Sequence, residues 1–148
     1  MEVQTVMSKS VRSVDASEPI SKAARIMGEA DVGSLPVLDN GKLVGIVTDR
    51  DVAVGAVGNE VKVSNPVERV MTRDVQTCQS DADVEDVLQI MGDQQIRRMP
   101  VCDDEGSVVG IVSIGDLIRK DPDQQEVAEA LSEICKPSTR HCQQVGSD

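Results

Sequence analysis

The feature that most constrains the fold of this chain is an internal repeat. Val6-Met7 recurs 64 residues later as Val70-Met71, and one extra residue near Glu105 then moves the spacing to 65, so that Asp51 matches Asp116. The extra residue falls in a turn rich in Asp and Gly, where insertions disturb a fold least. The same register relates Ile26-Met27-Gly28 to Ile90-Met91-Gly92, Pro36-Val37 to Pro100-Val101, and Val44-Gly45-Ile46-Val47 to Val109-Gly110-Ile111-Val112. The chain therefore contains two copies of one folding unit.

Each copy predicts the order strand, helix, strand, strand, helix. The first helix of each copy has apolar residues at positions i, i+3, i+4 and i+7, which gives it one face for a core. These residues are Ile20, Ala23, Ala24 and Met27 in one copy and Val84, Val87, Leu88 and Met91 in the other. Ser17 with Pro19, and Ser80 with Asp81 and Asp83, suit the first turns of these helices. The predicted strands are 11–14, 35–38 and 43–47, then 75–78, 99–102 and 108–112, and the final helices begin near Asp49 and Ile114.

The predicted fold class is α/β of the α+β kind, with two β-α-β-β-α repeats. Neither copy has enough apolar surface to stand alone, so we expect a pseudo-two-fold pair with a small-ligand cleft between the repeats. The expected domains are 6–63 and 70–121, followed by a C-terminal helix and tail over 122–148. In that last part, Gln124–Ile134 predicts a helix that packs on the module or on a second subunit, and the residues after Lys136 predict a loose tail.

Composition excludes several function classes. The net charge of -11 argues against binding to nucleic acid or to acidic membrane surfaces, and the absence of Phe, Tyr and Trp removes aromatic stacking on bases. No apolar run is long enough to span a bilayer, and the first residues lack the pattern of a secretory signal, so cytoplasmic is the expected location. A single histidine, without a nucleophile elbow or a Gly-rich phosphate loop, predicts that the protein is not an enzyme.

The four cysteines show no CxxC spacing. Cys78 and Cys102 occupy the positions of Val14 and Leu38 in the other copy, on strands that could bring them within disulfide reach. Such a disulfide would contribute about 3 kcal/mol, and two buried free thiols are the alternative. Cys135, His141 and Cys142 do not predict a metal site, because no fourth ligand accompanies them.

The two copies resemble cystathionine-beta-synthase-type (CBS) domains, and the pair resembles the regulatory unit called a Bateman module. The resemblance covers roughly residues 6–120 and excludes the last helix and tail. Within the family, the chain is similar to small bacterial hypoxia- or stress-response proteins. The matching segments are Val6-Met7 and Val70-Met71, Gly33-Ser34-Leu35-Pro36-Val37 and Arg97-Arg98-Met99-Pro100-Val101, and the stretches from Val44 to Asp51 and from Val109 to Asp116.

The resemblance implies that adenosyl compounds such as AMP, ADP, ATP, NAD or S-adenosylmethionine bind between the repeats. It implies a ligand role for Thr48 with Asp51 and for Ser113 with Asp116, a Ser or Thr followed three residues later by Asp. Asp can accept hydrogen bonds from both ribose hydroxyls, and a hydroxyl at a helix start can face a phosphate. The adenine ring would lie between aliphatic side chains. The implied lining residues are Ile46, Val47, Ile111 and Val112, together with Gly33, Ser34, Pro36 and Pro100.

Simpler roles remain open for these residues. Both hydroxyl-to-carboxylate sequences are also ordinary helix N-caps, and the two roles can coexist. Arg97 and Arg98 are the basic pair beside the expected cleft, where the first copy has Gly33 and Ser34. They are candidate phosphate receptors, with solvated surface residues as the alternative. The difference between the copies makes one ligand per chain as reasonable as two.

The sequence therefore predicts a non-enzymatic sensor of adenine nucleotides that needs no cofactor, assembles as a homodimer and reports ligand occupancy to a partner protein. The alternative is a structural or protein-interaction module without nucleotide, with a redox-responsive pair in Cys78 and Cys102. A third reading is a regulatory piece of a larger enzyme or transporter.

Overall fold

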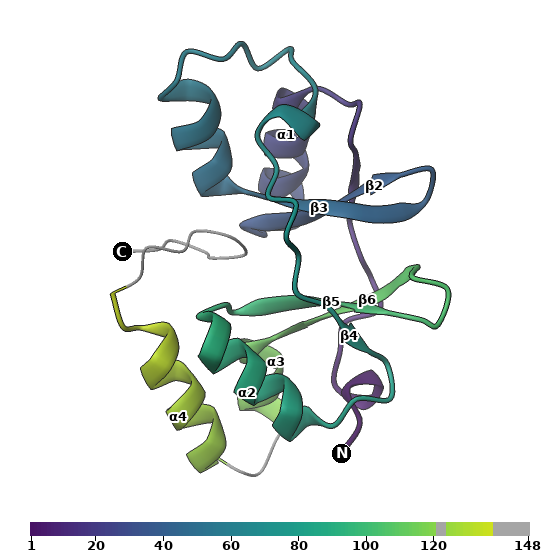
Figure 1. The fold of residues 1–148 in the computed structure, drawn as a ribbon, viewed down its shortest axis with the longest axis vertical. Coiled ribbons are helices and arrows are strands. Elements are labelled where there is room, and N and C mark those ends of the chain that lie inside the picture. The colour runs from purple at the N-terminus through teal and green to yellow at the C-terminus, as the bar shows by residue number, and fades with distance from the viewer. Residues whose placement is uncertain (121–123, 138–148) are drawn as a thin grey trace. The chain divides into compact units, whose positions relative to one another are not determined.

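The computed structural model describes residues 1–120 and 124–137 and gives both repeats the predicted order of elements (Figure 1). The first repeat comprises β1 (Val14–Asp15), α1 (Ile20–Ala30), β2 (Ser34–Asp39), β3 (Lys42–Thr48) and the helical segment η2 (Asp51–Val57). The second comprises β4 (Cys78–Gln79), α2 (Val84–Gln94), β5 (Arg98–Cys102), β6 (Val108–Ser113) and α3 (Ile114–Lys120), and α4 (Gln124–Ile134) follows it. Two short 3₁₀ helices, η1 (Val3–Thr5) and η3 (Val67–Arg69), precede the repeats. The α+β class and the repeat are confirmed.

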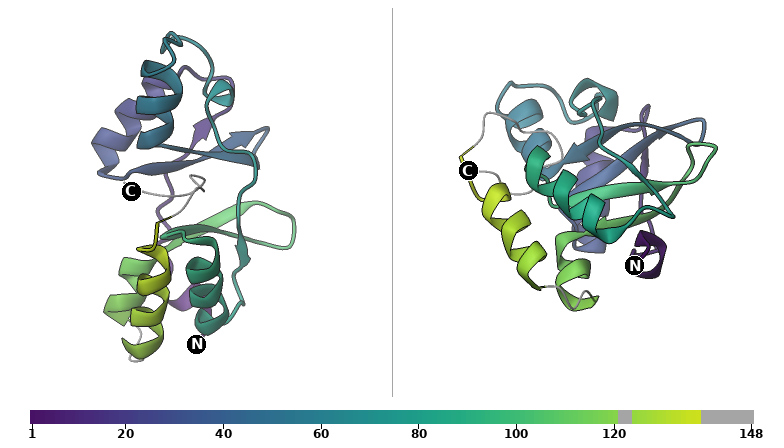
Figure 2. Two further views of the ribbon diagram at one scale, coloured as in Figure 1. Left: turned by 60° about the vertical axis from the view of Figure 1, so that its left-hand side comes forward. Right: turned by 60° about the horizontal axis from the view of Figure 1, so that its bottom comes forward.

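Each repeat forms a mixed three-stranded sheet. The strand order is β1-β2-β3 in one sheet and β4-β5-β6 in the other, and in both the first pair is parallel and the second antiparallel. Both antiparallel pairs shift register at the matching place, between Val37 and Leu38 and between Val101 and Cys102. In the second sheet, α2, α3 and α4 cover one face (Figure 2). The side chains that alternate with the core residues along each strand point to the other face of the sheet.

The compact units are not continuous in sequence, because the segments that precede the repeats are exchanged. The first-repeat unit is Arg12–Val75, and the second-repeat unit combines Met1–Val11 with the described residues from Gln76 onward. In the second-repeat unit, Ser8 and Ile111 exchange backbone hydrogen bonds of 2.8 and 2.9 Å. Thr72 and Ile46 do the same in the first-repeat unit, at 2.8 and 2.9 Å. The units therefore cut across the continuous ranges 6–63 and 70–121 expected from the sequence.

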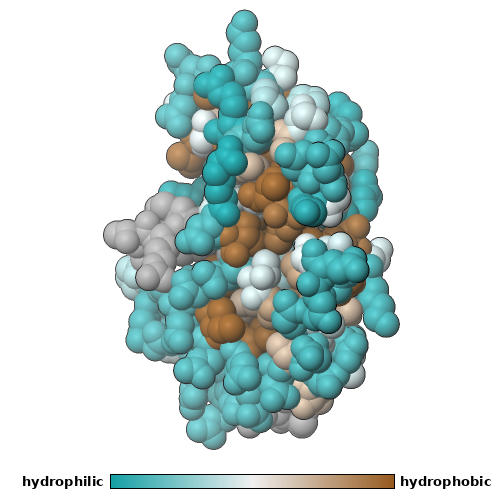
Figure 3. All heavy atoms as spheres, turned by 45° about the vertical axis from the view of Figure 1, so that its right-hand side comes forward, coloured by the Kyte–Doolittle hydropathy of each residue, from teal (hydrophilic) through white to brown (hydrophobic). Residues whose placement is uncertain are grey.

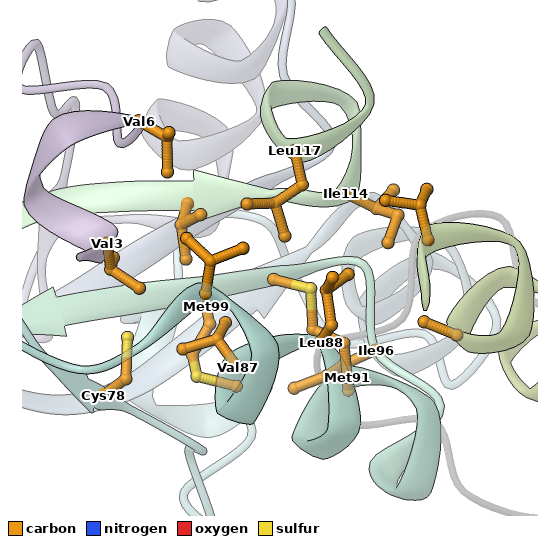
Figure 4. Packing of buried hydrophobic residues seen from close by; sticks show 14 of the residues in the cluster. Val3, Val6, Cys78, Val87, Leu88, Met91, Ile96, Met99, Ile114 and Leu117 are labelled. Atoms are coloured by element: carbon orange, nitrogen blue, oxygen red, sulfur yellow. The ribbon is translucent and has the colours of Figure 1, made fainter. Parts of the chain in front are cut away.

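The exchanged segments also supply core residues. Val3 and Val6 are buried against Met99 and the helices of the second-repeat unit (Figure 4). Val67 and Met71 are buried in the core of the first-repeat unit. Each fully buried aliphatic side chain stabilises the folded state by roughly 1.5–3 kcal/mol. Each core is therefore completed by a segment from outside its own repeat.

Several local expectations need correction. Ala24 is exposed and Ile26 is buried instead. The face of α1 that meets the core is therefore rotated slightly from the predicted face. Ser17 does not cap α1, since its hydroxyl donates to the Asp15 carboxylate at 2.7 Å. The helix instead starts after Pro19, which makes no side-chain cap hydrogen bond.

The first N–H groups of both helices find distant carbonyls. Ile20 N–H donates to the Asn65 carbonyl in the first-repeat unit, and Val84 N–H donates to the Met1 carbonyl in the second-repeat unit, both at 2.9 Å. Unpaired N–H groups at a helix start need such acceptors. The exchanged segments therefore complete the helices as well as the cores.

The predictions for the last helix of the first repeat and for the C-terminal helix differ in outcome. The last helix of the first repeat is a π-helix over Asp51–Val57, a rare form that the sequence pattern does not predict. In contrast, α4 has the predicted bounds and packs on α2, with Val127, Ala130 and Ile134 buried. The Gln95 amide secures its end by donating to the carbonyls of Glu133 and Lys136 at 3.0 and 3.1 Å. The predicted tail after Lys136 lies almost wholly outside the described residues.

Candidate functional site

The two predicted hydroxyl-to-carboxylate pairs form the same hydrogen-bonded turn. Thr48 N–H donates to Asp51 Oδ2 at 2.9 Å, and Asp51 N–H donates to Thr48 Oγ1 at 3.0 Å. Ser113 N–H donates to Asp116 Oδ2 at 3.0 Å, and Asp116 N–H donates to Ser113 Oγ at 3.1 Å. Such reciprocal bonds are a capping arrangement. The capping role is therefore present in both units, and it fixes each carboxylate at the end of a strand.

The strand pairing brings the other predicted polar residues to these turns. In the first-repeat unit, Ser34 lies opposite Thr48 in the β2–β3 pair, and the Gly33 carbonyl accepts a hydrogen bond from Asp49 N–H at 2.9 Å. In the second-repeat unit, Arg98 lies opposite Ser113 in the β5–β6 pair. The Arg97 carbonyl accepts a hydrogen bond from Ile114 N–H at 2.8 Å. Gly33 and Ser34 thus border the Thr48–Asp51 turn, and Arg97 and Arg98 border the Ser113–Asp116 turn.

The predicted aliphatic lining divides into two sets. Val47 and Val112 are fully buried inside the two hydrophobic cores, opposite Leu35 and Met99, so their side chains face the helices. We therefore do not keep them as ligand contacts. The pairs on the other face of each sheet are Pro36 with Ile46 and Pro100 with Ile111. The alternation of side chains in a strand places these pairs on the same face as Thr48 and Ser113.

The two carboxylates differ in their electrostatic setting. Burial raises the pKa of Asp51 above its usual value, and the hydrogen bonds from Thr48 offset only part of this effect. Thr48 itself is fully buried. Asp116 instead forms an ion pair with Arg119, whose Nη2 lies 2.7 Å from Asp116 Oδ1. One turn therefore has a carboxylate that resists ionisation, and the other has a guanidinium in contact with its carboxylate.

Arg119 lies beside the Ser113–Asp116 turn and was not among the residues predicted from the sequence. Its Nη1 lies 3.5 Å from the point where a Cβ at Gly115 would stand, and Ser113 Oγ lies 3.6 Å from the same point. The guanidinium therefore extends over Gly115 beside the Ser113 hydroxyl. The repeat spacing contained the signal, because it matches Arg119 with Val54 and so marks a third position where only the second repeat has an arginine.

The cysteine pair is present as thiols in this structure. Cys78 and Cys102 are both buried and free. Burial raises the pKa of Cys78 to about 11, with a smaller contribution from Cys102, and burial also raises the pKa of Cys102. Because thiol–disulfide exchange needs a thiolate, such thiols react slowly. The redox-responsive alternative gains no support from this setting.

Other candidate features contribute no ligand chemistry to these turns. Among the described residues, no group of three or more His, Cys, Asp or Glu could hold a metal ion, while His141 and Cys142 lie outside those residues. No helix within the described part of the chain is long and apolar enough to cross a membrane. A groove of about 410 Å³ lies between α2 and α4, away from the predicted residues. Its carboxylates are those of Glu85, Asp86, Asp93, Glu126, Glu129 and Glu133. The face drawn in Figure 3 is mostly hydrophilic, with apolar side chains gathered near its middle.

Comparison with known proteins gives consistent matches. A family model described as "CBS domain" matches residues 3–56 and 67–123. The CBS domain-containing protein YhcV of Bacillus subtilis is 33% identical over 132 residues, which cover 89% of this chain and 94% of YhcV. Hypoxic response protein 1 of Mycobacterium tuberculosis is 30% identical over 134 residues, which cover 89% of this chain and 92% of that protein.

A solved structure also matches over most of its length. The CBS domain pair of protein MJ0100, in complex with 5′-methylthioadenosine and S-adenosylmethionine, superposes with a TM-score of 0.73 and 35% identity. The match covers 80% of this chain and 94% of that one. These likenesses confirm the predicted resemblance to small proteins built from a pair of such domains.

Proposed function

Because this chain belongs to the CBS-domain family, we propose that it is a non-enzymatic regulatory module that binds adenosyl compounds at the Thr48–Asp51 and Ser113–Asp116 turns. The observation that carries the proposal is the identical turn in both units, in which a carboxylate is held three residues after a hydroxyl. A carboxylate held in this way can accept hydrogen bonds from the two hydroxyls of a ribose.

The turns have the donors and acceptors that a nucleoside needs. In each capping bond the carboxylate accepts through Oδ2, which leaves Oδ1 as its second acceptor oxygen. At Asp116 this oxygen already accepts from Arg119, so a ribose hydroxyl would share it with the guanidinium. The apolar pairs on this side of the sheets are Pro36 with Ile46 and Pro100 with Ile111. Ile46 is buried and Ile111 is partly exposed, so Ile111 is the candidate contact for an adenine ring. The complex of MJ0100 with two adenosyl compounds supports the choice of ligand class.

The proposed mechanism is a shift between conformations. A ligand that binds one arrangement of the protein better than another increases the population of that arrangement. A partner protein then recognises the favoured arrangement. No covalent step is required, and the ligand leaves unchanged.

Thermal unfolding provides the test. We expect AMP, ATP, S-adenosylmethionine or 5′-methylthioadenosine, at 100 times its dissociation constant, to stabilise the protein by roughly 2.7 kcal/mol. Calorimetry or an added dye must report the transition, since the chain has no Trp or Tyr. The matched control is the double variant Asp51→Asn/Asp116→Asn, in which the amide oxygen can keep each capping bond. If none of the four compounds shifts the wild-type transition at millimolar concentration, the proposed function is wrong.

We also propose that the module is a cytoplasmic homodimer. Buried, unpaired thiols at Cys78 and Cys102 suit a reducing compartment. Val57 on η2 and Ile118 on α3 are large apolar side chains that the single chain leaves exposed. Exposed aliphatic residues of this kind are candidates for a subunit contact. Light scattering gives the mass, and a monomer in solution would contradict the dimer.

A further inference from the structure

The two turns lie in opposite electrostatic surroundings. Beside Ser113–Asp116, the arginines at positions 97, 98 and 119 outnumber the single aspartate and give a net charge of +2. Beside Thr48–Asp51, the matched positions are Gly33, Ser34 and Val54. There, Asp49 and Asp51 outnumber Arg50, and the net charge is -1. A negatively charged ligand is therefore favoured beside Ser113–Asp116 and disfavoured beside Thr48–Asp51.

The three arginines approach the second turn from two different elements. Arg98 lies on β5 directly opposite Ser113, and its neighbour Arg97 is held at the turn by the hydrogen bond from Ile114 N–H to its carbonyl, 2.8 Å long. Arg119 comes from α3 and contacts Asp116 at 2.7 Å, across the space that Gly115 leaves open. Arg97 and Arg98 are half-buried, and the Arg119 side chain is 67% exposed. Arg98 faces the same side of the sheet as Ser113, and the Arg119 guanidinium contacts Asp116, so these two positive charges lie at the turn and within reach of a ligand.

The chemistry of a guanidinium indicates the class of ligand. Its planar fork forms paired, charge-assisted hydrogen bonds with phosphate oxygens, and it stays protonated at any physiological pH. A phosphate chain attached to a ribose at Asp116 would meet these forks. At the first-repeat turn the same phosphate chain would meet Asp49 and Asp51 instead, and repulsion between like charges would weaken its binding.

On the basis of the proposed function, the structure assigns different ligands to the two turns. The Ser113–Asp116 turn binds adenosine phosphates, and Arg98 and Arg119 determine this preference. The Thr48–Asp51 turn binds adenosyl compounds that lack phosphate, either neutral thioethers or cationic sulfonium compounds, for which a negative surrounding is no obstacle. The module can then respond separately to two chemically distinct adenosyl compounds.

Titration calorimetry with ATP and with 5′-methylthioadenosine tests this assignment. Asp116→Asn should remove ATP binding and leave 5′-methylthioadenosine binding within about twofold, and Asp51→Asn should do the reverse. Arg98→Ser, which copies Ser34, should weaken ATP binding at least about tenfold, the loss expected for a charge-assisted bond. The same variant should leave 5′-methylthioadenosine binding unchanged. Arg25→Ser is the matched control, because it removes one positive charge from the exposed surface of α1.

A second variant keeps the test independent of lost folding. Val54→Arg introduces at the first-repeat turn the arginine that Arg119 provides at the other, at a side chain that is 53% exposed. In the Asp116→Asn background it should restore measurable ATP binding. The assignment is overturned if one aspartate variant removes both ligands, if Arg98→Ser acts no more strongly than Arg25→Ser, or if Val54→Arg restores nothing. In those cases the protein still binds ligand and the proposed function stands. A wild-type protein that binds neither ligand would contradict both the assignment and the proposed function.

Discussion

In the first-repeat unit, the Thr48–Asp51 turn is bordered by Gly33 and Ser34 and its hydroxyl is fully buried. In the second-repeat unit, the Ser113–Asp116 turn is half-buried and bordered by arginines. The capping hydrogen bonds, from backbone N–H groups to side-chain oxygens, are nonetheless the same within about 0.1 Å. The comparison teaches that the capping bonds define the turn, whereas the side chains around it are free to differ. Ligand preference can then diverge without any change of fold.

The exchanged segments offer the comparison with the largest expected effect, because they pack on a glycine in each unit. A Cβ at Gly45 would lie 2.7 Å from Met71 Sδ and 2.8 Å from the Thr72 carbonyl oxygen. A Cβ at Gly110 would clash mainly with Met7 Sδ, while the Ser8 carbonyl oxygen would lie at 3.0 Å. A thioether can rotate away but a hydrogen-bonded carbonyl cannot. We expect Gly45→Ala to destabilise the protein by about 3 kcal/mol and Gly110→Ala by about 1 kcal/mol, measured by urea unfolding.

A double-mutant cycle sharpens this difference. Met7→Ala removes the atom that a Cβ at position 110 would meet, so it should recover most of the loss caused by Gly110→Ala. Met71→Ala leaves the Thr72 carbonyl in place and should recover little of the loss caused by Gly45→Ala. Equal coupling in the two cycles would show that the two segments are held in the same way.

Removal of the hydroxyl cap should have the next largest effect. Thr48→Val leaves Asp51 N–H without its acceptor in a fully buried setting, and we expect a loss of about 1–2 kcal/mol of unfolding free energy. Ser113→Ala removes the equivalent acceptor where water can replace it, and we expect a loss of about 0.5–1 kcal/mol. Urea unfolding of both variants checks the order. A larger loss for Ser113→Ala would contradict the role given to burial.

Features encoded locally could be predicted from the sequence. The apolar stripe of α2 and the bounds of α4 follow from helical periodicity, and comparing the two copies identified both hydroxyl-to-carboxylate turns. Only the capping geometry of these turns is directly visible in the structure, while their ligand role remains a proposal. The same comparison could have identified Arg119, but only if the register had been followed from the strand into the helix.

Features that depend on distant partners could not be predicted. Val6 and Val70 match each other in the repeat, but a match in sequence does not say on which sheet each segment packs. The start of α1 shows the same limit, because its acceptor is the Asn65 carbonyl and a backbone acceptor has no sequence signature. Val47 and Val112 appear in apolar runs that suit both a core and a ligand surface, and only the strand register assigns them to the core.

The smallest expected effect concerns the buried carboxylate and depends on pH. Because burial raises the pKa of Asp51 in the folded state, ionised Asp51 opposes folding at neutral pH. As the pH falls through this raised pKa, Asp51 takes up a proton in the folded state before it does so in the unfolded state. The destabilisation by ionised Asp51 is therefore lost, and it remains absent below the pKa of the unfolded state. Asp51→Asn keeps a cap acceptor but cannot titrate. Wild type should therefore gain stability relative to Asp51→Asn between about pH 7 and pH 4, as urea unfolding would show. A gap that is constant with pH would mean that the capping bonds from Thr48 balance the burial of the carboxylate, and a change in the opposite direction would mean that they outweigh it. Either result would make this turn less different from its counterpart than their exposures indicate.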